Sequence, residues 1–246
     1  MRFLSIIFLF SLSVGIAHAG PQIDVGEMYD YLDGDKSSFL KRVFNAGDST
    51  AFVKVNVLEI VYDAQGMPEE VPLKSQSELP ARNGLMASPA RLIVPANGMQ
   101  GARLLFMGER DHERYFRVRF VPVIPEKEDQ FAVPEAERQT YEKTLSAGVN
   151  VLAGYGTIFF VRPANTRFDT RVSGDASTYF MSNKGNSVVI IDQFKDCPIG
   201  KDVDCKPTSK HHVLPGKDFQ FDKQAGREYR FTLIEGVAKT PVTIKG

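Results

Sequence analysis

The segment Tyr115-Phe116-Arg117-Val118-Arg119-Phe120 decides the fold class of this chain. Apolar side chains at residues 116, 118 and 120 alternate with arginines at residues 117 and 119, so the two kinds lie on opposite faces of an extended strand. A period of two is typical of a strand with one buried and one wet face. We therefore expect Tyr115–Val123 to belong to an antiparallel sheet, with Arg117 and Arg119 on a solvated face.

Similar short segments lie on both sides of this strand. Ala51–Tyr62 alternates in the same way, and Val149–Val161 is the most apolar strand expected in the chain. Turns rich in Gly, Pro, Asn and Asp separate these segments, which predicts an all-β chain built of sandwiches. Pro125–Lys143 is expected to be a loop or a short helix, since Glu135–Lys143 contains no helix breaker. Other expected strands here are Ile23–Tyr31, Phe39–Asn45, Ala90–Val94 and Ala102–Met107, with a loop at Asp63–Leu79.

Arg162-Pro163 follows the most apolar strand and is expected to end a first domain. A second series of short strands follows, beginning near Arg167 and closing with Thr240–Ile244. The chain of 246 residues has room for two domains of about 100 residues, each large enough to bury a core. We therefore predict two sandwiches, at residues 20–163 and 164–246.

The first 19 residues have the layout of a secretory signal peptide. Arg2 precedes an apolar run, and Ala17-His18-Ala19 supplies small residues before a cut at Gly20. The run is shorter than the ~20 residues that a membrane-spanning helix needs. Because no other apolar stretch is longer, we expect a secreted protein without membrane insertion. The 30 basic and 30 acidic residues balance, which argues against binding of nucleic acid.

Two cysteines, Cys197 and Cys205, lie close together in the sequence. In a secreted chain we expect them to form a local disulfide at the tip of a hairpin. The alternative is a metal site that includes His211 and His212, but two thiols without further ligands do not make one. The sequence contains no Gly-x-Ser-x-Gly motif, phosphate-binding loop or His-Glu-x-x-His motif. We therefore expect no catalytic residue, no metal and no cofactor.

Four stretches resemble the periplasmic chaperones of the chaperone–usher pathway, which assemble bacterial pili. They are Ala87–Gly98 with the following Arg103-Leu104, Tyr115–Phe120, Gly154–Pro163, and Tyr179–Ile191 with the cysteine pair. The resemblance extends over essentially the whole chain after residue 19. The tyrosine-glycine strand and the cysteine hairpin are most similar to the alternative class, which assembles alpha-type (CS1-like) fimbriae.

The resemblance implies two immunoglobulin-like β-sandwich domains in a boomerang arrangement. Such chaperones bind fimbrial (pilin) subunits that lack the last strand of their own fold, by inserting a donor strand from the first domain. In this sequence the donor side chains would be Val149, Val151 and Ala153. The partners implied are fimbrial subunits and an outer-membrane usher, and self-association through the donor strand stays open. The same strand could instead be central in its sheet, and a register slip by one residue would present Asn150 and Leu152.

The sequence departs from the family at the residues that anchor the subunit's C-terminal carboxylate. Tyr29 and Ile158 occupy the positions of the family's arginine and lysine. Arg42 is the substitute candidate, because it shares parity with Leu40 and Phe44 on an otherwise apolar strand face, which would leave Lys41 facing outward. Arg162 and Pro163 match the family's hinge, where the arginine resembles an interdomain salt-bridge former.

Two other functions from different classes remain. A pilus subunit or adhesin of the same fold would carry an exposed N-terminal donor extension and an incomplete sandwich, whereas strands for two complete domains are expected here. A secreted carbohydrate-binding sandwich would place aromatic side chains on an exposed face, and this chain has eight tyrosines but no tryptophan.

Overall fold

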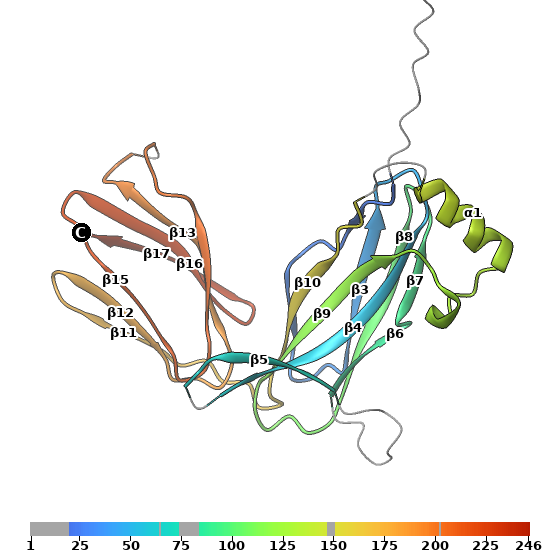
Figure 1. Cartoon of the computed structure of the whole chain (residues 1–246). Coiled ribbons are helices and arrows are strands. Elements are labelled where there is room, and N and C mark those ends of the chain that lie inside the picture. Colours follow the sequence, from blue (N-terminus) through green and yellow to red (C-terminus); the bar gives the residue numbers. More distant parts are fainter. Residues whose placement is uncertain (1–19, 64, 74–83, 147–150, 202) are drawn as a thin grey trace, which may run out of the picture.

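The computed structural model describes residues 20–246 except 64, 74–83, 147–150 and 202. The predicted signal peptide and Val149 lie outside the described residues. The described chain forms two β-sandwiches set at an angle to each other, in the boomerang arrangement expected (Figure 1). The prediction of an all-β fold with two immunoglobulin-like sandwiches is confirmed.

The N-terminal sandwich contains two sheets. One sheet has the strand order β1-β3-β8-β6 and the other has the order β2-β10-β9-β4-β5, with β7 also paired to β4. Phe116, Val118 and Phe120 are buried between them, as the alternation predicts, and Phe159 of β10 packs in the same core. The strands are β1 (Ile23–Asp24), β2 (Tyr29–Leu32), β3 (Ser38–Asn45), β4 (Ala51–Tyr62), β5 (Pro68–Pro72), β6 (Gly84–Ser88), β7 (Arg91–Val94), β8 (Met99–Met107), β9 (Arg114–Val123) and β10 (Tyr155–Val161).

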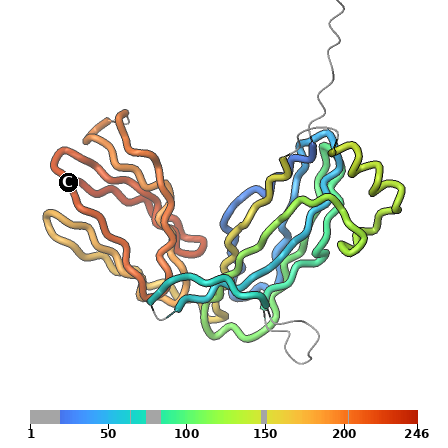
Figure 2. Tube along the Cα trace, viewed as in Figure 1, coloured from blue at the N-terminus to red at the C-terminus, as the bar shows by residue number. Residues whose placement is uncertain are grey.

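The first expected strand, Ile23–Tyr31, is wrong as a single element. β1 pairs antiparallel with β3 in one sheet, whereas β2 pairs parallel with β10 in the other. Gly26 lies between them with φ of +67°, a conformation that glycine adopts at little cost. The chain therefore changes sheets at this point, and β2 covers only part of the edge of β10 (Figure 2).

The loop expected at Asp63–Leu79 is also wrong in part, because β5 forms there and pairs with the second half of β4. Its sequence is too polar to signal a strand, since Glu69 and Glu70 stand at its centre. Glu70 binds Arg117 and Arg119 of β9, and this pairing compensates the charge on an otherwise unusual strand.

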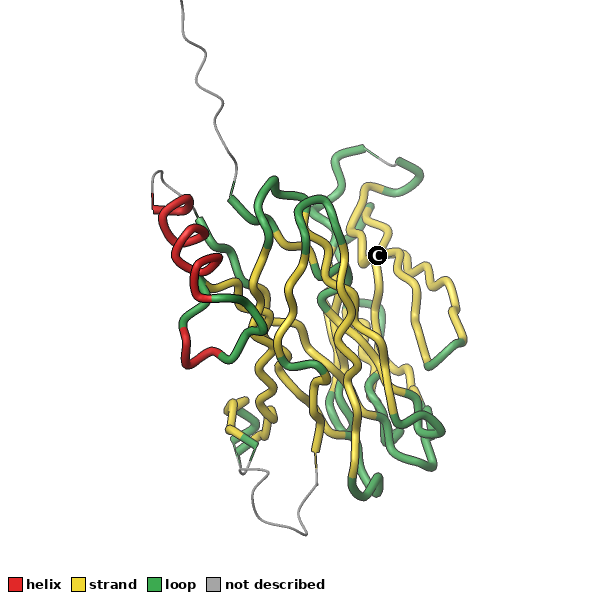
Figure 3. The backbone as a smooth tube through the Cα atoms, turned by 90° about the vertical axis from the view of Figure 1, so that its right-hand side faces the viewer, coloured by secondary structure: helices red, strands yellow, loops and turns green. Residues whose placement is uncertain are grey.

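The segment after β9 contains a short 3₁₀ helix, Lys127–Asp129, and helix α1, Glu135–Ser146. Of the two alternatives expected for Pro125–Lys143, a loop or a short helix, the structure therefore has the helix. Figure 3 shows α1 outside the strand layers, against one side of the N-terminal sandwich. The chain then returns to β10.

The C-terminal sandwich has one sheet in the order β11-β12-β15 and another in the order β14-β13-β16-β17. Met181 and Ile191 are fully buried in its own core. Cys197 and Cys205 form the predicted disulfide, with the two sulfurs 2.07 Å apart. The strands are β11 (Thr170–Gly174), β12 (Thr178–Asn183), β13 (Val189–Pro198), β14 (Ser209–Val213), β15 (Asp218–Asp222), β16 (Arg227–Glu235) and β17 (Ala238–Lys245).

Candidate functional site

The N-terminal half of β10 has an open edge. Pairing with β2 begins at Ile158, whose N–H donates to the Met28 carbonyl at 2.8 Å. Successive N–H groups of a strand point to opposite sides, so that of Gly156 faces the same side as that of Ile158, and in an extended chain those of Gly154 and Leu152 continue on this side. Among the described residues no strand pairs with this side before Ile158. The edge exists because the chain changes sheets at Gly26.

Residues 151–154 precede β10 but are not part of it, so the expected strand Val149–Val161 is wrong at its start. Tyr155 is opposite Phe120 of β9, and continuing that register places Ala153 opposite Pro122. Proline has no N–H to donate to a ladder, which explains why pairing ends here. The segment Val151–Gly154, named the donor segment below, is thus free of a strand on either side within the described chain.

The side chains of the donor segment continue the buried row of β10. Tyr155, Thr157 and Phe159 face the core, and in an extended chain Val151 and Ala153 have the same parity. Val151 is 80% exposed and Ala153 is exposed, whereas Leu152 is half-buried. The row that closes the sandwich core therefore continues beyond it as exposed apolar side chains beside an open edge, an arrangement that invites pairing with another strand.

The prediction that Arg42 shares the inner face of β3 and that Lys41 faces outward is wrong. Lys41 is 3% exposed, and its Nζ donates to Asp30 Oδ2 at 2.7 Å and to the Glu27 carbonyl at 2.5 Å. Leu40 and Phe44 are 42% and 46% exposed, so Arg42 shares the outer face with them. The physical reason is the carboxylate of Asp30 on β2, which compensates an inward lysine between the two sheets.

Arg117 is a basic residue whose side chain reaches the open edge. Tyr29 and Ile158 are opposite each other in the β2–β10 pairing, and Arg117 is opposite Ile158 on β9. The Arg117 side chain crosses Gly156, where a Cβ would lie 3.1 Å from its Cδ, and Nη1 donates to the Gly156 carbonyl at 2.9 Å. The alternation in the sequence predicts only a solvated face for Arg117. A glycine in mid-strand was the signal available, since it marks a close approach.

Arg162 lies at the junction of the two sandwiches. Its Nη1 binds Asp33 Oδ1 at 2.7 Å, and its guanidinium lies 5.3 Å from the ring centroid of Tyr31 and 5.5 Å from that of Phe168. Asp33 belongs to the N-terminal sandwich, so this ion pair does not cross the junction as the resemblance implied. The contact that crosses is the cation–π contact with Phe168.

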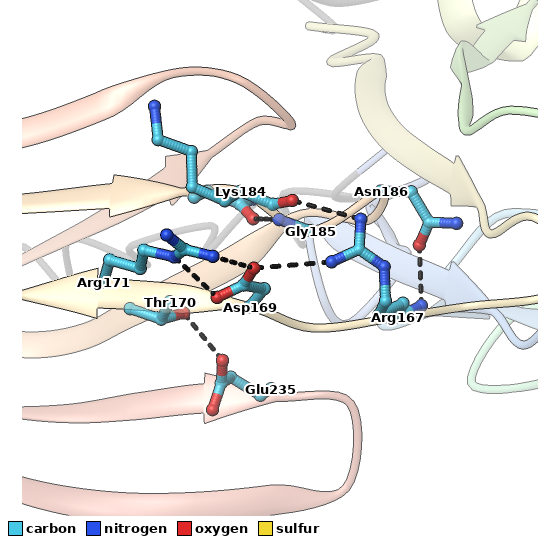
Figure 4. Close-up of polar contacts among 9 residues, drawn as sticks. Arg167, Asp169, Thr170, Arg171, Lys184, Gly185, Asn186 and Glu235 are labelled. Atoms are coloured by element: carbon cyan, nitrogen blue, oxygen red, sulfur yellow. Dashed lines mark hydrogen bonds and ion pairs between the residues drawn. The ribbon is translucent and has the colours of Figure 1, made fainter.

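Glu113 makes a second contact across the junction. Its carboxylate is buried and accepts hydrogen bonds from Ser187 Oγ at 2.5 Å and from the Val188 N–H at 3.0 Å. Burial raises the pKa of Glu113 above its ordinary value. The loop that carries Ser187 is held by hydrogen bonds from Arg167 Nη2 to the Lys184 carbonyl and from the Arg167 N–H to Asn186 Oδ1 (Figure 4).

His212 of β14 makes the third contact. Its Nε2 lies 2.6 Å from the Tyr31 hydroxyl, and its ring stacks on Phe160 with centroids 5.3 Å apart. Burial, together with nearby Lys210 and His211, lowers the pKa of His212 to about 4. The imidazole is therefore neutral near pH 7 and packs as an aromatic ring. No spacing in the sequence distinguished His212 from the other histidines.

Within the described part of the chain, no cluster of three or more His, Cys, Asp or Glu side chains could hold a metal ion. None of the helices found there is both long and apolar enough to cross a bilayer.

Comparison with known proteins finds fimbrial chaperones both among proteins of similar sequence and among proteins of similar fold. The chain is 25% identical over 235 residues to the probable fimbrial chaperone EcpB of Klebsiella pneumoniae (strain 342), covering 94% of this chain and 95% of the relative. It is 26% identical over 246 residues to the probable fimbrial chaperone EcpB of Escherichia coli (strain K12 / DH10B), covering 97% of each. No family model matches the sequence.

Two solved structures share the fold over most of the chain. The class 5 fimbriae chaperone CfaA has a TM-score of 0.56 at 19% identity, covering 92% of this chain and 99% of that one. A chain from a chaperone–tip adhesin complex of CFA/I fimbriae biogenesis has a TM-score of 0.52 at 18% identity, covering 91% and 97%. The chain therefore has the two-sandwich fold of fimbrial chaperones. It is a homologue of proteins named EcpB, which confirms the predicted resemblance.

Proposed function

We propose that this protein is a periplasmic chaperone that binds fimbrial subunits by strand addition and delivers them to an outer-membrane usher. The observation that carries the proposal is the open edge of β10, continued by the exposed Val151 and Ala153. The relatives named fimbrial chaperones support fimbrial subunits as the clients. The secretory layout of residues 1–19 supports the periplasm as the compartment.

The mechanism follows from the edge and its side chains. A subunit strand that pairs with Leu152, Gly154 and Gly156 satisfies backbone groups on both chains, and Val151 and Ala153 enter the uncovered core of the subunit. Val149 is proposed to extend the same row. Each buried valine would contribute on the order of 1–3 kcal/mol, and the alanine less. This is strand pairing and burial rather than chemistry, so we propose that the protein is not an enzyme and needs no cofactor.

We also propose that Arg117, rather than Arg42, receives the C-terminal carboxylate of the subunit. Arg117 reaches the open edge over Gly156, whereas Arg42 lies on β3 in the other sheet. Arg119 offers a matched control, because it binds the same Glu70, whereas the hydrogen bond to the Gly156 carbonyl comes from Arg117. Arg117→Ala should weaken subunit binding at least tenfold, while Arg119→Ala should change it less than threefold.

The experiment that tests the function is co-expression with fimbrial subunits encoded beside this gene, followed by size-exclusion chromatography of the periplasmic fraction. The wild type should elute in a one-to-one complex, and Val151→Asp should lose it. Val172→Asp is the matched control, because Val172 is 58% exposed on β11 in the other sandwich. Equal binding by Val151→Asp, or no complex with soluble wild type, would refute the proposal; glycan binding would then be measured.

A further inference from the structure

The segment Pro125–Ser146, named the arm below, connects β9 to the donor segment and is docked on the N-terminal sandwich. It covers the outer face of β4 near its start. Ala51 and Val53 face the core, so the alternate residues Phe52 and Lys54 point outward. Phe52 is nevertheless 5% exposed, because the arm lies over it. A buried aromatic ring on the outer face of a sheet is the sign of a specific docking site.

Two aromatic rings of the arm hold Phe52. Phe131 meets it edge-on with centroids 5.4 Å apart, and Tyr141 of α1 meets it edge-on at 4.8 Å. The Tyr141 hydroxyl donates to the Thr50 carbonyl at 2.7 Å. Burial raises the pKa of Tyr141 to about 12, in keeping with a hydroxyl directed at the protein rather than at water. Edge-on aromatic pairs each contribute about 0.5–1.5 kcal/mol beyond their buried area.

Polar contacts fix the first turn of the arm. The Asp129 carboxylate pairs with Lys54 of β4, and Arg91 of β7 donates to the Asp129 carbonyl. Asp129 also accepts a hydrogen bond from the Glu126 N–H, which closes the short helix on itself. Two strands therefore hold the arm through charge at its start, and the aromatic rings hold it through packing further along.

The docked arm limits where the donor segment can lie. α1 ends at Ser146, and Leu145 beside it is buried. At most about 3.6 Å per residue, five steps along the chain keep Val151 within roughly 18 Å of Ser146. At its other end the donor segment continues directly into β10. The donor segment is thus tethered to the docked arm at one end and joined to β10 at the other, and both tethers belong to the same sandwich.

We propose that the arm positions the donor segment for its client, with Phe52, Phe131 and Tyr141 as positioning residues. A segment tethered at both ends to one sandwich has fewer conformations to lose when a partner strand pairs with it, so binding is tighter than with an undocked arm. This inference rests on the proposed function. It assigns the docked helix a role in client affinity.

Distances between spin labels test the positioning without any client. Labels at Val151→Cys and Arg103→Cys, an exposed site on β8, report the position of the donor segment; the two native cysteines are disulfide-bonded and do not compete for label. We expect a single narrow distance distribution in the labelled parent. Tyr141→Ala should broaden it at least twofold, and Tyr141→Phe, which loses only the hydroxyl, should broaden it less. Thr140→Ala, at an exposed neighbour on α1, should leave it unchanged.

Capture of the co-expressed fimbrial subunit gives the second readout. Tyr141→Ala should weaken binding about tenfold relative to Thr140→Ala, since the edge-on contact with Phe52 and the hydrogen bond to the Thr50 carbonyl are lost. A narrow distribution and unchanged capture in Tyr141→Ala, while Val151→Asp abolishes capture, would overturn the positioning role and leave the proposed function intact. If Val151→Asp still binds, the proposed function itself fails. A circular dichroism spectrum matching the parent establishes that each variant is folded.

Discussion

At the scale of single residues, Lys41 and Asp30 form a buried ion pair between the two sheets of the N-terminal sandwich. Removing one partner leaves an uncompensated buried charge, which costs about 3–5 kcal/mol. We expect Lys41→Met to lower the free energy of unfolding by that amount and Lys41→Met with Asp30→Leu to regain most of it. Urea denaturation measures both. Lys36→Met, which breaks the exposed pair with Asp33, should cost less than about 1 kcal/mol; an equally small cost for Lys41→Met would contradict this account.

The half-buried His212 predicts a dependence of stability on pH. Its pKa is about 4 in the folded protein and 6.5 in an ordinary environment, so between these values the unfolded state binds more protons. Stability therefore falls as pH decreases from about 6.5 to 4, by this residue's contribution. We expect a smaller loss over that range in His212→Gln, measured by thermal unfolding at each pH. Glu113 and Asp30 titrate in the same samples, so the difference between the two proteins is the test. Parallel curves would show that His212 is not half-buried as described.

At the scale of elements, the strands with a clean period of two could be predicted from the sequence, and those defined by their neighbours could not. β4 and β9 were visible because one face of each is apolar. β5 was not, since Glu70 is explained only by arginines on β9. The parity of Val151 and Ala153 was readable locally, but the open edge depends on where β2 begins to pair, and that pairing joins residues far apart in the chain. The face of β3 that carries Arg42 was predicted wrongly for the same reason, because Asp30, which compensates the inward Lys41, lies on another strand.

The disulfide between Cys197 and Cys205 is a local element of the C-terminal sandwich. A closed loop this short contributes roughly 2–3 kcal/mol by restricting the unfolded chain. We expect Cys197→Ala with Cys205→Ala to destabilise the C-terminal sandwich by that amount and leave subunit capture unchanged, because the donor segment lies in the other sandwich. Hydrogen exchange of peptides from each sandwich separates the two effects. Faster exchange confined to the N-terminal sandwich would contradict this assignment.

At the scale of the whole molecule, the contacts between the sandwiches among the described residues include Arg162 with Phe168, Glu113 with Ser187 and Val188, and Tyr31 with His212. Arg162 contacts both sides, so Arg162→Ala should widen the range of interdomain angles. Spin labels at Arg103→Cys and Val172→Cys, one on each sandwich, measure that range. Arg171→Ala, which loses only an exposed pair with Asp169, is the control. An unchanged distribution in Arg162→Ala would show that the other contacts suffice.

The central claim is that a client strand pairs with the open edge of β10. Residue-resolved hydrogen exchange on the chaperone, free and in complex with a co-expressed fimbrial subunit, tests it directly. We expect the amides of Leu152, Gly154 and Gly156 to exchange at least tenfold more slowly in the complex, because they face the client, while amides of β11 are unaffected. Unchanged exchange at these three amides in a stable complex would contradict strand addition at this edge and place the client elsewhere on the molecule.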